Sequence, residues 1–209
     1  MGTSNRLPAV FIGDSVALDF LNTLTVRADD PYEWLLDGEA LLSWLEQAKL
    51  VPDNVLNTFR ALPPSDDLGA VATRARELRE WFRAFVGEHR GHPLSAAAVT
   101  ELAPVNRILE RDALFSQIVM KPSRRTEEEF SKLELVSQRR WAVADALLVP
   151  LAEAIGRFVV SDDFASIRSC EGRKCSMFFL DRRGRRWCSM TTCGNRAKQA
   201  MYRERVKGH

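Results

Sequence analysis

Four cysteines near the C-terminal end of the sequence are the residues whose type and spacing best suit a chemical role. Cys170 and Cys175 form one pair, Cys188 and Cys193 form a second, and the 209-residue chain contains no other cysteine. Four residues separate the members of each pair, so one local turn can present two thiolates. The spacing predicts a tetrahedral Zn²⁺ site with four thiolate ligands. Because such a shell leaves no open position for water, the metal is structural, and we expect the chain not to be an enzyme.

Two disulfides, or four unrelated buried thiols, are the alternative interpretations of these cysteines. Disulfides form in oxidising compartments, whereas Asp19 interrupts the apolar run at residues 16–21 and leaves no signal peptide. No segment approaches the roughly 18 apolar residues of a membrane span. We therefore expect a cytoplasmic protein whose clustered cysteines bind metal. His89 and His92 also have a metal-like spacing, but the four cysteines already complete a tetrahedron.

The sequence around the cysteines resembles the CGNR-type zinc finger. The similar segments are FLD at 179–181, RRWCSM at 185–190 and CGNRAK at 193–198. In bacteria this finger ends proteins that begin with the ABATE domain, and GDSVALDFLNT at 13–23 is similar to the start of that domain. Together the two resemblances cover essentially the whole chain. They imply a treble-clef finger and a DNA-binding role in stress-induced transcription regulation.

Charge is distributed unevenly along the chain. Residues 168–209 contain twelve Lys or Arg and three Asp or Glu, a charge of +9, although the whole chain has a net charge of +2. The remaining 167 residues therefore carry a charge of −7. A mildly acidic body with a strongly basic C-terminal part indicates that only the C-terminal part contacts a polyanion.

The treble-clef interpretation predicts the local structure of the C-terminal part. A knuckle bears the first cysteine pair, strands at 177–180 and 185–187 form a hairpin, and a helix begins near Cys193 and runs to about Val206. We expect this helix to pack on the hairpin through three residues, Ala197, Ala200 and Met201.

The remaining faces of that helix are basic or carry amides, which suits a DNA major groove, and the arginines of the hairpin tip suit phosphate. The candidate nucleic-acid-binding residues are Arg182, Arg183, Arg185, Arg186, Asn195, Arg196, Lys198, Gln199, Arg203 and Arg205.

Other interpretations of the basic C-terminal part remain open. Asn195 and Arg196 also suit a role in which they hydrogen-bond the knuckle and orient the metal ligands. RNA binding is an alternative function, because Phe178, Phe179 and Trp187 lie among basic residues and single-strand readers stack bases on aromatic side chains. A zinc-stapled protein-interaction module is a third possibility, although it needs no excess of positive charge.

The first 163 residues predict a mostly helical domain. Apolar residues recur at helical spacing in residues 16–24, 41–48, 68–89 and 136–159, and residues 114–135 predict a β-hairpin. The expected fold class is therefore mainly α (α+β). A helical N-terminal domain with a small β-hairpin occupies residues 1–163, and a treble-clef zinc finger occupies residues 164–209.

The polar residues of the N-terminal domain are expected to have mainly structural roles. The mixed charges of residues 74–80 indicate a solvated helix face. Asp19 and Asn22 are expected to hydrogen-bond the loop beside them, with contact to a small-molecule effector as the alternative. In the DNA-binding regulator that we expect, this domain senses a signal or mediates interactions, and a homodimer remains open.

Overall fold

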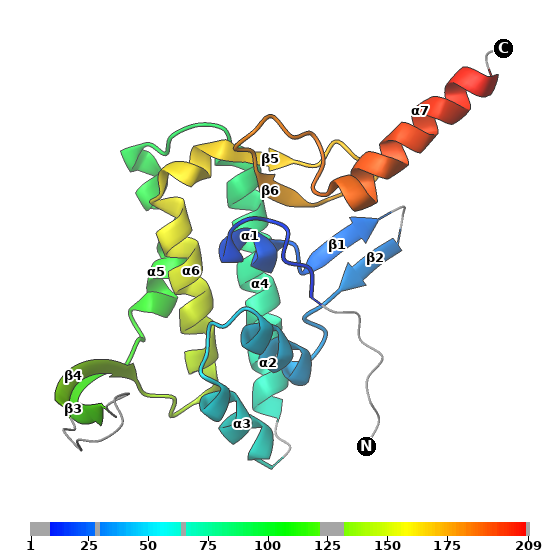
Figure 1. The fold of residues 1–209 in the computed structure, drawn as a ribbon. Coiled ribbons are helices and arrows are strands. Elements are labelled where there is room, and N and C mark those ends of the chain that lie inside the picture. Colours follow the sequence, from blue (N-terminus) through cyan, green and yellow to red (C-terminus); the bar gives the residue numbers. More distant parts are fainter. Residues whose placement is uncertain (1–8, 28–29, 64–65, 122–131, 208–209) are drawn as a thin grey trace.

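The computed structural model describes residues 9–27, 30–63, 66–121 and 132–207 (Figure 1). Helices account for most of the secondary structure of these residues, and their strands form three two-stranded antiparallel sheets. The expected mainly α, α+β fold class is confirmed. Within the described ranges, none of the helices combines the length and the apolar character that a membrane crossing requires.

The long helix α4 (Asp66–His89) runs through the middle of the molecule (Figure 1). Its buried apolar side chains, from Val71 to Val86, recur at intervals of three and four residues and form the apolar stripe of an amphipathic helix. The helices α1 (Val16–Leu21) and α2 (Gly38–Gln47) pack against α4, and α6 (Val149–Val159) packs against α1. Their apolar faces share one core.

Shorter helices complete the N-terminal domain. Pro104 lies in the first turn of α5, which packs against α6. Pro150 likewise lies in the first turn of α6, where its missing N–H group has no helical partner to lose. The remaining elements of this group are α3 (Asp53–Ala61), η1 (Ala96–Val99), α5 (Ala103–Leu109), η2 (Ala144–Leu148) and η3 (Asp162–Ser166).

Strands occur as three separate antiparallel pairs. The first pairs β1 (Leu24–Arg27) with β2 (Asp30–Glu33). The second pairs β3 (Leu114–Lys121) with β4 (Lys132–Arg139) and stands away from the helices at the lower left of Figure 1. The third pairs β5 (Ile167–Ser169) with β6 (Phe178–Leu180), close to the last helix, α7 (Asn195–Lys207).

Two helix predictions are wrong in part. The helix expected at residues 136–159 is replaced by the end of β4, the turn η2 and α6. Residues 136–139 pair with β3, which satisfies their backbone groups in a sheet, and the helix begins only at Val149. The helix expected at residues 16–24 ends at Leu21, because residues 24–27 form β1. The predicted β3–β4 hairpin is present, with a longer return strand than expected.

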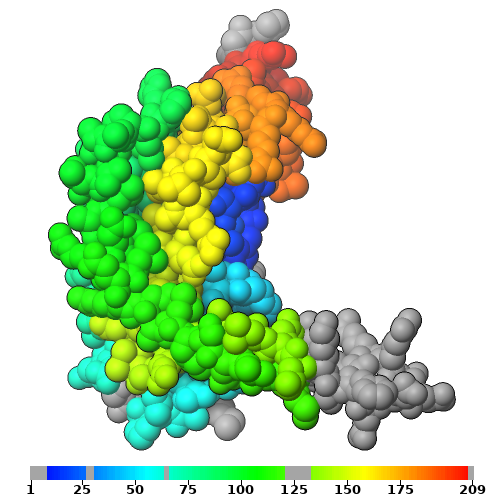
Figure 2. Space-filling model, turned by 90° about the vertical axis from the view of Figure 1, so that its left-hand side faces the viewer, coloured from blue at the N-terminus to red at the C-terminus, as the bar shows by residue number. Residues whose placement is uncertain are grey.

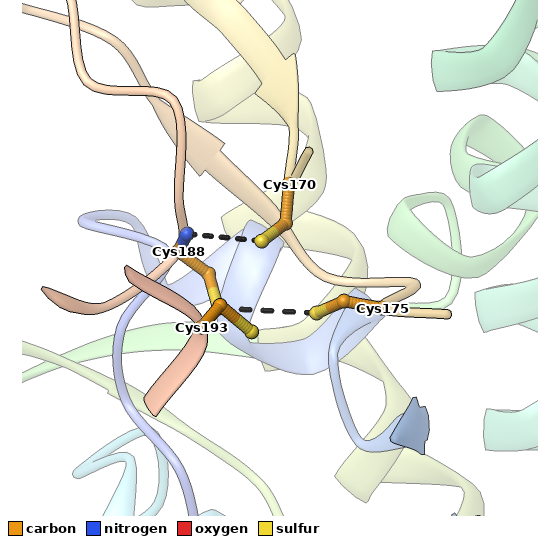
Figure 3. Close-up of side chains that lie close together, drawn as sticks. All are labelled: Cys170, Cys175, Cys188 and Cys193. Atoms are coloured by element: carbon orange, nitrogen blue, oxygen red, sulfur yellow. Dashed lines mark hydrogen bonds between the residues drawn. The ribbon is translucent and has the colours of Figure 1, made fainter. Parts of the chain in front are cut away.

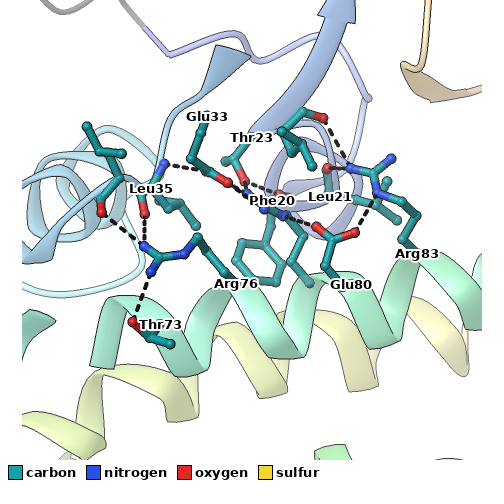
Figure 4. Close-up of polar contacts among 12 residues, drawn as sticks. Phe20, Leu21, Thr23, Glu33, Leu35, Thr73, Arg76, Glu80 and Arg83 are labelled. Atoms are coloured by element: carbon teal, nitrogen blue, oxygen red, sulfur yellow. Dashed lines mark hydrogen bonds and ion pairs between the residues drawn. The ribbon is translucent and has the colours of Figure 1, made fainter. Parts of the chain in front are cut away.

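Among the arginines of α4, Arg79 is buried and Arg76 and Arg83 are half-buried (Figure 4), so the solvated face expected from the mixed charges of residues 74–80 is wrong for Arg79. Arg79 is 2% exposed and donates two hydrogen bonds of 2.7 Å to the Glu33 carboxylate. Although burial opposes ionisation, these bonds hold the pKa of Glu33 below its usual value. Arg83 donates to the carbonyl of Leu21, and Arg76 to that of Leu35. Three arginines thus tie the segment from α1 to α2 onto α4.

Candidate metal centre and nucleic-acid interface

A tight turn after β5 positions the first two cysteines. Cys170 directly follows the strand, and its sulfur accepts a hydrogen bond from the Gly172 N–H at 3.3 Å. Cys175 N–H then donates to the Gly172 carbonyl at 3.0 Å, which closes the knuckle. A Cβ atom at Gly172 would lie 3.0 Å from the Cys193 sulfur. Glycine is therefore required for the close approach of the knuckle to the second cysteine pair.

The second pair lies where the chain turns into the last helix (Figure 3). Cys188 N–H donates to the Cys170 sulfur at 3.2 Å, so the two pairs are joined directly. Cys193 lies in the π-helical turn η4 (Met190–Gly194), which leads straight into α7. A Cβ atom at Gly194 would lie 2.7 Å from the Met190 sulfur, so the flexible and 48% exposed side chain of Met190 would have to move to admit it.

The four sulfurs are spaced as a metal site requires. Sulfurs at the corners of a tetrahedron with metal–sulfur bonds of about 2.3 Å lie about 3.8 Å apart. The sulfurs of Cys175 and Cys188 are 3.9 Å apart, and those of Cys188 and Cys193 are 3.6 Å apart. All four sulfurs, including that of Cys170, lie within 4.8 Å of one another. A disulfide requires about 2.0 Å, so the geometry favours metal over the disulfide alternative.

The crowded thiols perturb one another electrostatically. Hydrogen bonding by the Cys188 thiol lowers the pKa of Cys175 to about 5, and the same contact raises the pKa of Cys188. Burial raises the pKa of Cys193 to about 11. A bound cation offsets the mutual repulsion that opposes ionisation of all four sulfurs.

The finger differs from the predicted hairpin. The strand β6 pairs with β5 and not with residues 185–187, which form no strand in the described chain. The carboxylate of Asp181 accepts hydrogen bonds from the N–H groups of Arg183 at 3.2 Å and Arg185 at 3.0 Å. This carboxylate satisfies the backbone of the turn, so the chain turns back without a two-stranded ladder.

Comparison with protein families supports two regions of similarity. A family described as "ABATE: Putative stress-induced transcription regulator" matches residues 14–162, and the CGNR zinc finger family matches residues 166–206. The chain belongs to the ABATE family. The resemblance inferred from the sequence is therefore confirmed. No curated protein matches the chain. The name ABATE domain is used below for residues 14–162, and CGNR finger for residues 166–206.

The CGNR finger docks on residues 10–22, which lead into and begin the ABATE domain. Asn22 exchanges two hydrogen bonds with the backbone of Phe178, one in each direction, at 2.8 and 2.9 Å. The Gly13 carbonyl accepts from the Leu180 N–H at 3.2 Å. Val10 and Ile12 pack against the cysteine cluster. The N-terminal motif thus anchors the finger, a role that its similarity to the ABATE domain had not indicated.

Asp19 holds the N-terminal end of this motif in place through a hydrogen bond to its backbone. It is buried, and its carboxylate accepts a hydrogen bond from the Gly13 N–H at 2.8 Å, as expected for a residue that holds the neighbouring loop. Burial raises the pKa of Asp19 to about 6. Its protonation state therefore changes near neutral pH.

Arginines of the predicted hairpin tip are engaged in ion pairs. Arg185 pairs with Asp14 of the ABATE domain and lies over the ring of Phe179, 4.3 Å from its centre. Arg182 pairs with Asp163 at 2.7 Å, and Arg186 pairs with Glu171 at 2.6 Å. Arg185 thus acts within the protein, which is a different role from the predicted phosphate contact. The exposed guanidinium groups of Arg182 and Arg186 remain accessible beside their acidic partners.

The predicted contacts on α7 are presented to solvent. Within the described chain, none of their side chains makes an ion pair, and neither Asn195 nor Arg196 hydrogen-bonds the knuckle. The packing expected for Ala200 and Met201 is wrong, since both are exposed, Met201 by 54%, whereas Ala197 is half-buried. The exposed residues of the predicted set that make no ion pair within the described chain are Arg183, Asn195, Arg196, Lys198, Gln199, Arg203 and Arg205.

Sequence reasoning missed the acids and amides that fix the finger. Asp14, Asp163 and Glu171 each pair with an arginine that was expected to face nucleic acid. Asp163 and Glu171 lie 19 and 15 residues from their partners, whereas Asp14 lies 171 residues from Arg185. The signal available for Asn22 was its place in the motif at 13–23, because a buried amide needs partners. Nothing in the local pattern indicates that the partner lies 156 residues away.

Proposed function

We propose that the chain is a DNA-binding transcription regulator whose CGNR finger, folded around Zn²⁺, presents α7 to duplex DNA. The observation that carries this proposal is the exposed, unpaired charge of α7. Arg196, Lys198, Arg203 and Arg205 are all exposed, and within the described chain none of them has an acidic partner. Free cations on a projecting helix suit the phosphates and base edges of a major groove.

The distribution of side chains around α7 supports one binding face. At 100° per residue, the basic, amide and tyrosine side chains fall on one broad side of the helix. The only acid of α7, Glu204, falls on the opposite side together with Ala197, Ala200 and Met201. The residues of the proposed binding face are Asn195, Arg196, Lys198, Gln199, Tyr202, Arg203 and Arg205.

Zn²⁺ is the metal we propose for the four cysteines. Tetrahedral all-thiolate sites are typical of structural zinc, and the sulfur separations fit that geometry. The CGNR finger is too small to bury a sufficient apolar core of its own. A metal bound by Cys170, Cys175, Cys188 and Cys193 would join the knuckle to the turn that precedes α7. The direction in which α7 leaves the finger then depends on the metal.

The aromatic residues of the β6 strand favour duplex DNA over single-stranded RNA, because their rings are covered by other protein groups. Phe179 is buried, and the guanidinium of Arg185 covers its ring. Phe178 faces Arg83 of α4 and Arg90, which directly follows that helix. These rings therefore offer no open platform on which bases could stack. Apart from Tyr202, which is 70% exposed on α7, the finger presents charge on a helix rather than aromatic surface.

The ABATE domain supports the finger in this proposal and is the part that would receive a signal. Its docking contacts include Asn22 and Asp14, so a change in the ABATE domain reaches the finger directly. We place the regulator in the cytoplasm, where a reducing environment keeps the four thiols available for metal.

Fluorescence anisotropy of labelled duplex DNA, titrated with zinc-loaded protein over a series of salt concentrations, tests the proposal. We expect affinity to fall steeply with salt, and the Arg203→Glu/Arg205→Glu variant to bind at least about tenfold more weakly. Loss of two phosphate contacts lowers the salt slope by about 2. Single-stranded DNA and RNA serve as competitors.

The matched control is Arg107→Glu/Arg111→Glu, which reverses two exposed arginines at the end of α5 in the ABATE domain. We expect this control to bind DNA as the wild type does. Binding that is insensitive to salt, or equal losses in both variants, would count against α7 as the contact. Tighter binding to RNA would transfer the proposal to that class of nucleic acid.

A further inference from the structure

The β3–β4 ribbon, residues 114–121 and 132–139, projects from the body of the molecule (Figures 1 and 2). Space-filling atoms of its green and yellow-green strands extend beyond the helices at the lower right of Figure 2. None of the described side chains in either strand is buried. The ribbon is joined to the body at its base, where Arg139 pairs with Asp112 at 2.6 Å and with Glu153 at 3.1 Å.

The strand register divides the ribbon into two faces. Ile118 lies opposite Leu135, and Met120 lies opposite Leu133, so these four side chains share one face. Leu114 extends this face toward the base of the ribbon. The apolar ribbon face is defined here as Leu114, Ile118, Met120, Leu133 and Leu135.

The apolar ribbon face is also the more exposed of the two. Its five side chains are between 62% and 71% exposed. On the other face Phe115, Val119 and Val136 are half-buried, and the guanidinium of Arg140 covers the Phe115 ring. An amphipathic ribbon in a complete structure places its apolar face inward. Here the more polar face lies nearer to protein and the apolar face meets solvent.

The exposure of the apolar ribbon face indicates that another surface packs against it. A two-stranded ribbon without packing on either face is only marginally stable in water. Contiguous apolar patches on a monomer are small unless they form an interaction site. Ile118, Met120, Leu133 and Leu135 adjoin one another across the two strands and form a single patch, and Leu114 lies on the same face beyond the Ser116–Ser137 pair.

The chemistry of the patch restricts its partner. Its polar members are the facing hydroxyls of Ser116 and Ser137, whose oxygens lie 3.5 Å apart. The only charge on this face, Arg139, is neutralised by Asp112 and Glu153. Nucleic acid and charged peptides find no complementary charge there. A neutral, apolar surface is complementary to itself, because a copy of it brings no like charge into the contact.

We propose that the apolar ribbon face binds the same face of a second copy of the chain, forming a two-fold symmetric dimer. The two ribbons pack face to face, with Ile118 and Leu135 near the centre of the contact. Such an isologous contact closes on itself and buries both patches, so assembly stops at two chains. It also gives each ribbon the second layer that a stable sheet needs.

Dimer formation through this face leaves the finger free. The ribbon and α7 lie at opposite ends of the molecule in Figure 1. Neither the cysteine cluster nor the proposed DNA-binding face takes part in the contact. Dimerisation and DNA binding by each chain are therefore separable, and the dimer would carry two fingers.

Sedimentation velocity of the full, zinc-loaded chain tests the proposal. We expect the wild type to sediment as a dimer in the micromolar range, and the Ile118→Asp/Leu135→Asp variant as a monomer. Two like charges per chain brought together in the contact weaken dimerisation by at least about 100-fold. The matched control, Leu36→Asp, places the same charge at a 67% exposed leucine outside the ribbon and should remain dimeric.

A second variant separates loss of contact from loss of folding. Ile118→Thr/Leu135→Thr places β-branched, strand-favouring threonines at both positions and removes the large apolar side chains. It should also dissociate, while zinc content and helical circular dichroism match the wild type. A monomeric wild type would overturn the proposal. So would a threonine variant that stays dimeric, or a Leu36→Asp control that dissociates to the same extent.

Discussion

Asn22 and the backbone of Phe178 form a closed pair of hydrogen bonds between segments 156 residues apart. The side-chain N–H₂ donates to the Phe178 carbonyl at 2.8 Å, and the Phe178 N–H donates to the side-chain carbonyl at 2.9 Å. A single amide therefore occupies both backbone groups of a strand residue, as a neighbouring strand would. Through this pair the ABATE domain fixes the first residue of β6, directly after the knuckle.

Replacement of Asn22 by alanine should loosen the docked finger. The change leaves the Phe178 N–H and carbonyl without their partners, which costs about 1–3 kcal/mol for each group that stays buried. We expect faster hydrogen exchange at residues 178–180 and a lower free energy of unfolding. Zinc content should not change, because the cysteine cluster is intact.

Asn22→Asp gives a more specific form of this test. Aspartate keeps the acceptor for the Phe178 N–H but removes the donor for the carbonyl, so exchange at Phe178 itself should rise less than in the alanine variant. Equal protection of residues 178–180 in the wild type and both variants would show that the pair does not hold the finger.

Removal of the metal should unfold the finger and leave the ABATE domain folded. The cysteines pack with Met177 and Phe179 in a cluster of their own, separate from the core around α4, to which the finger contributes Ile167 and Leu180. Metal supplies an apparent 10–16 kcal/mol or so in comparable finger peptides. Chelation, or Cys188→Ser, should therefore abolish protection from exchange in residues 170–195 and preserve it in α4. Concerted loss of both regions would mean that the two units fold as one.

The buried ion pair of Arg79 and Glu33 predicts a large stability effect. Arg79→Met removes the charge that compensates Glu33 and should lower the free energy of unfolding by about 3–5 kcal/mol in urea denaturation. The Arg79→Met/Glu33→Leu double variant removes both charges and should recover much of that loss. Arg157→Met is the control, since Arg157 is 78% exposed in its pair with Glu153. It should cost less than about 1 kcal/mol.

The cysteine cluster could be predicted from the sequence because its ligands are rare, close together and few. Spacing within each pair limits the geometry to a turn, and a turn is determined mainly by local residues such as Gly172. Similarly, the 3.6-residue period of α4 predicts its buried face from neighbouring positions. Both features depend on interactions that are local in the sequence.

Contacts between distant segments could not be predicted in this way. Arg185 has the same local character as Arg183, yet the former pairs with Asp14 and the latter is exposed. Arg79 and Glu77 belong to one mixed-charge run, but only the first lies under the segment that bears Glu33. Residues 136–139 have apolar positions compatible with a helix, and their pairing with β3 overrides that pattern. Tertiary position decides these cases.

Asp19 predicts an unusual dependence of stability on pH. Its pKa rises from 3.8 to about 6 on folding, so between these values the folded chain binds more protons at this site than the unfolded chain. Its contribution to the free energy of unfolding therefore falls as pH increases through that window. A shift of about two pKa units corresponds to about 3 kcal/mol.

The variant Asp19→Asn removes this titration and keeps an oxygen to accept the Gly13 N–H. We expect its free energy of unfolding, relative to the wild type, to rise by about 2–3 kcal/mol from pH 4 to pH 7. Taking the difference between the two proteins cancels the titration of the cysteines and other shared groups. If the free energies of unfolding of the two proteins change in parallel with pH, folding does not raise the pKa of Asp19.

The pair of Arg185 and Asp14 distinguishes docking from DNA contact. Arg185→Asp places a like charge beside Asp14 and should reduce the protection of the finger from hydrogen exchange, with a cost of about 1 kcal/mol because Arg185 is 35% exposed and Asp14 is 49% exposed. The swapped variant, Asp14→Arg/Arg185→Asp, should restore protection, since the attraction is the same with its direction reversed.

DNA binding by the swapped variant then decides the role of Arg185. If this arginine serves only to dock the finger, the swap should bind duplex DNA with nearly wild-type affinity and an unchanged salt slope. Arg205→Asp is the control, because it removes one exposed charge of α7 and should lower the slope by about 0.9 without changing protection of the finger. The opposite result is a swapped variant that docks normally and loses as much affinity for DNA as Arg205→Asp does. That result would show that Arg185 contacts DNA. The measurement separates two roles that are indistinguishable for an arginine in a basic segment of sequence.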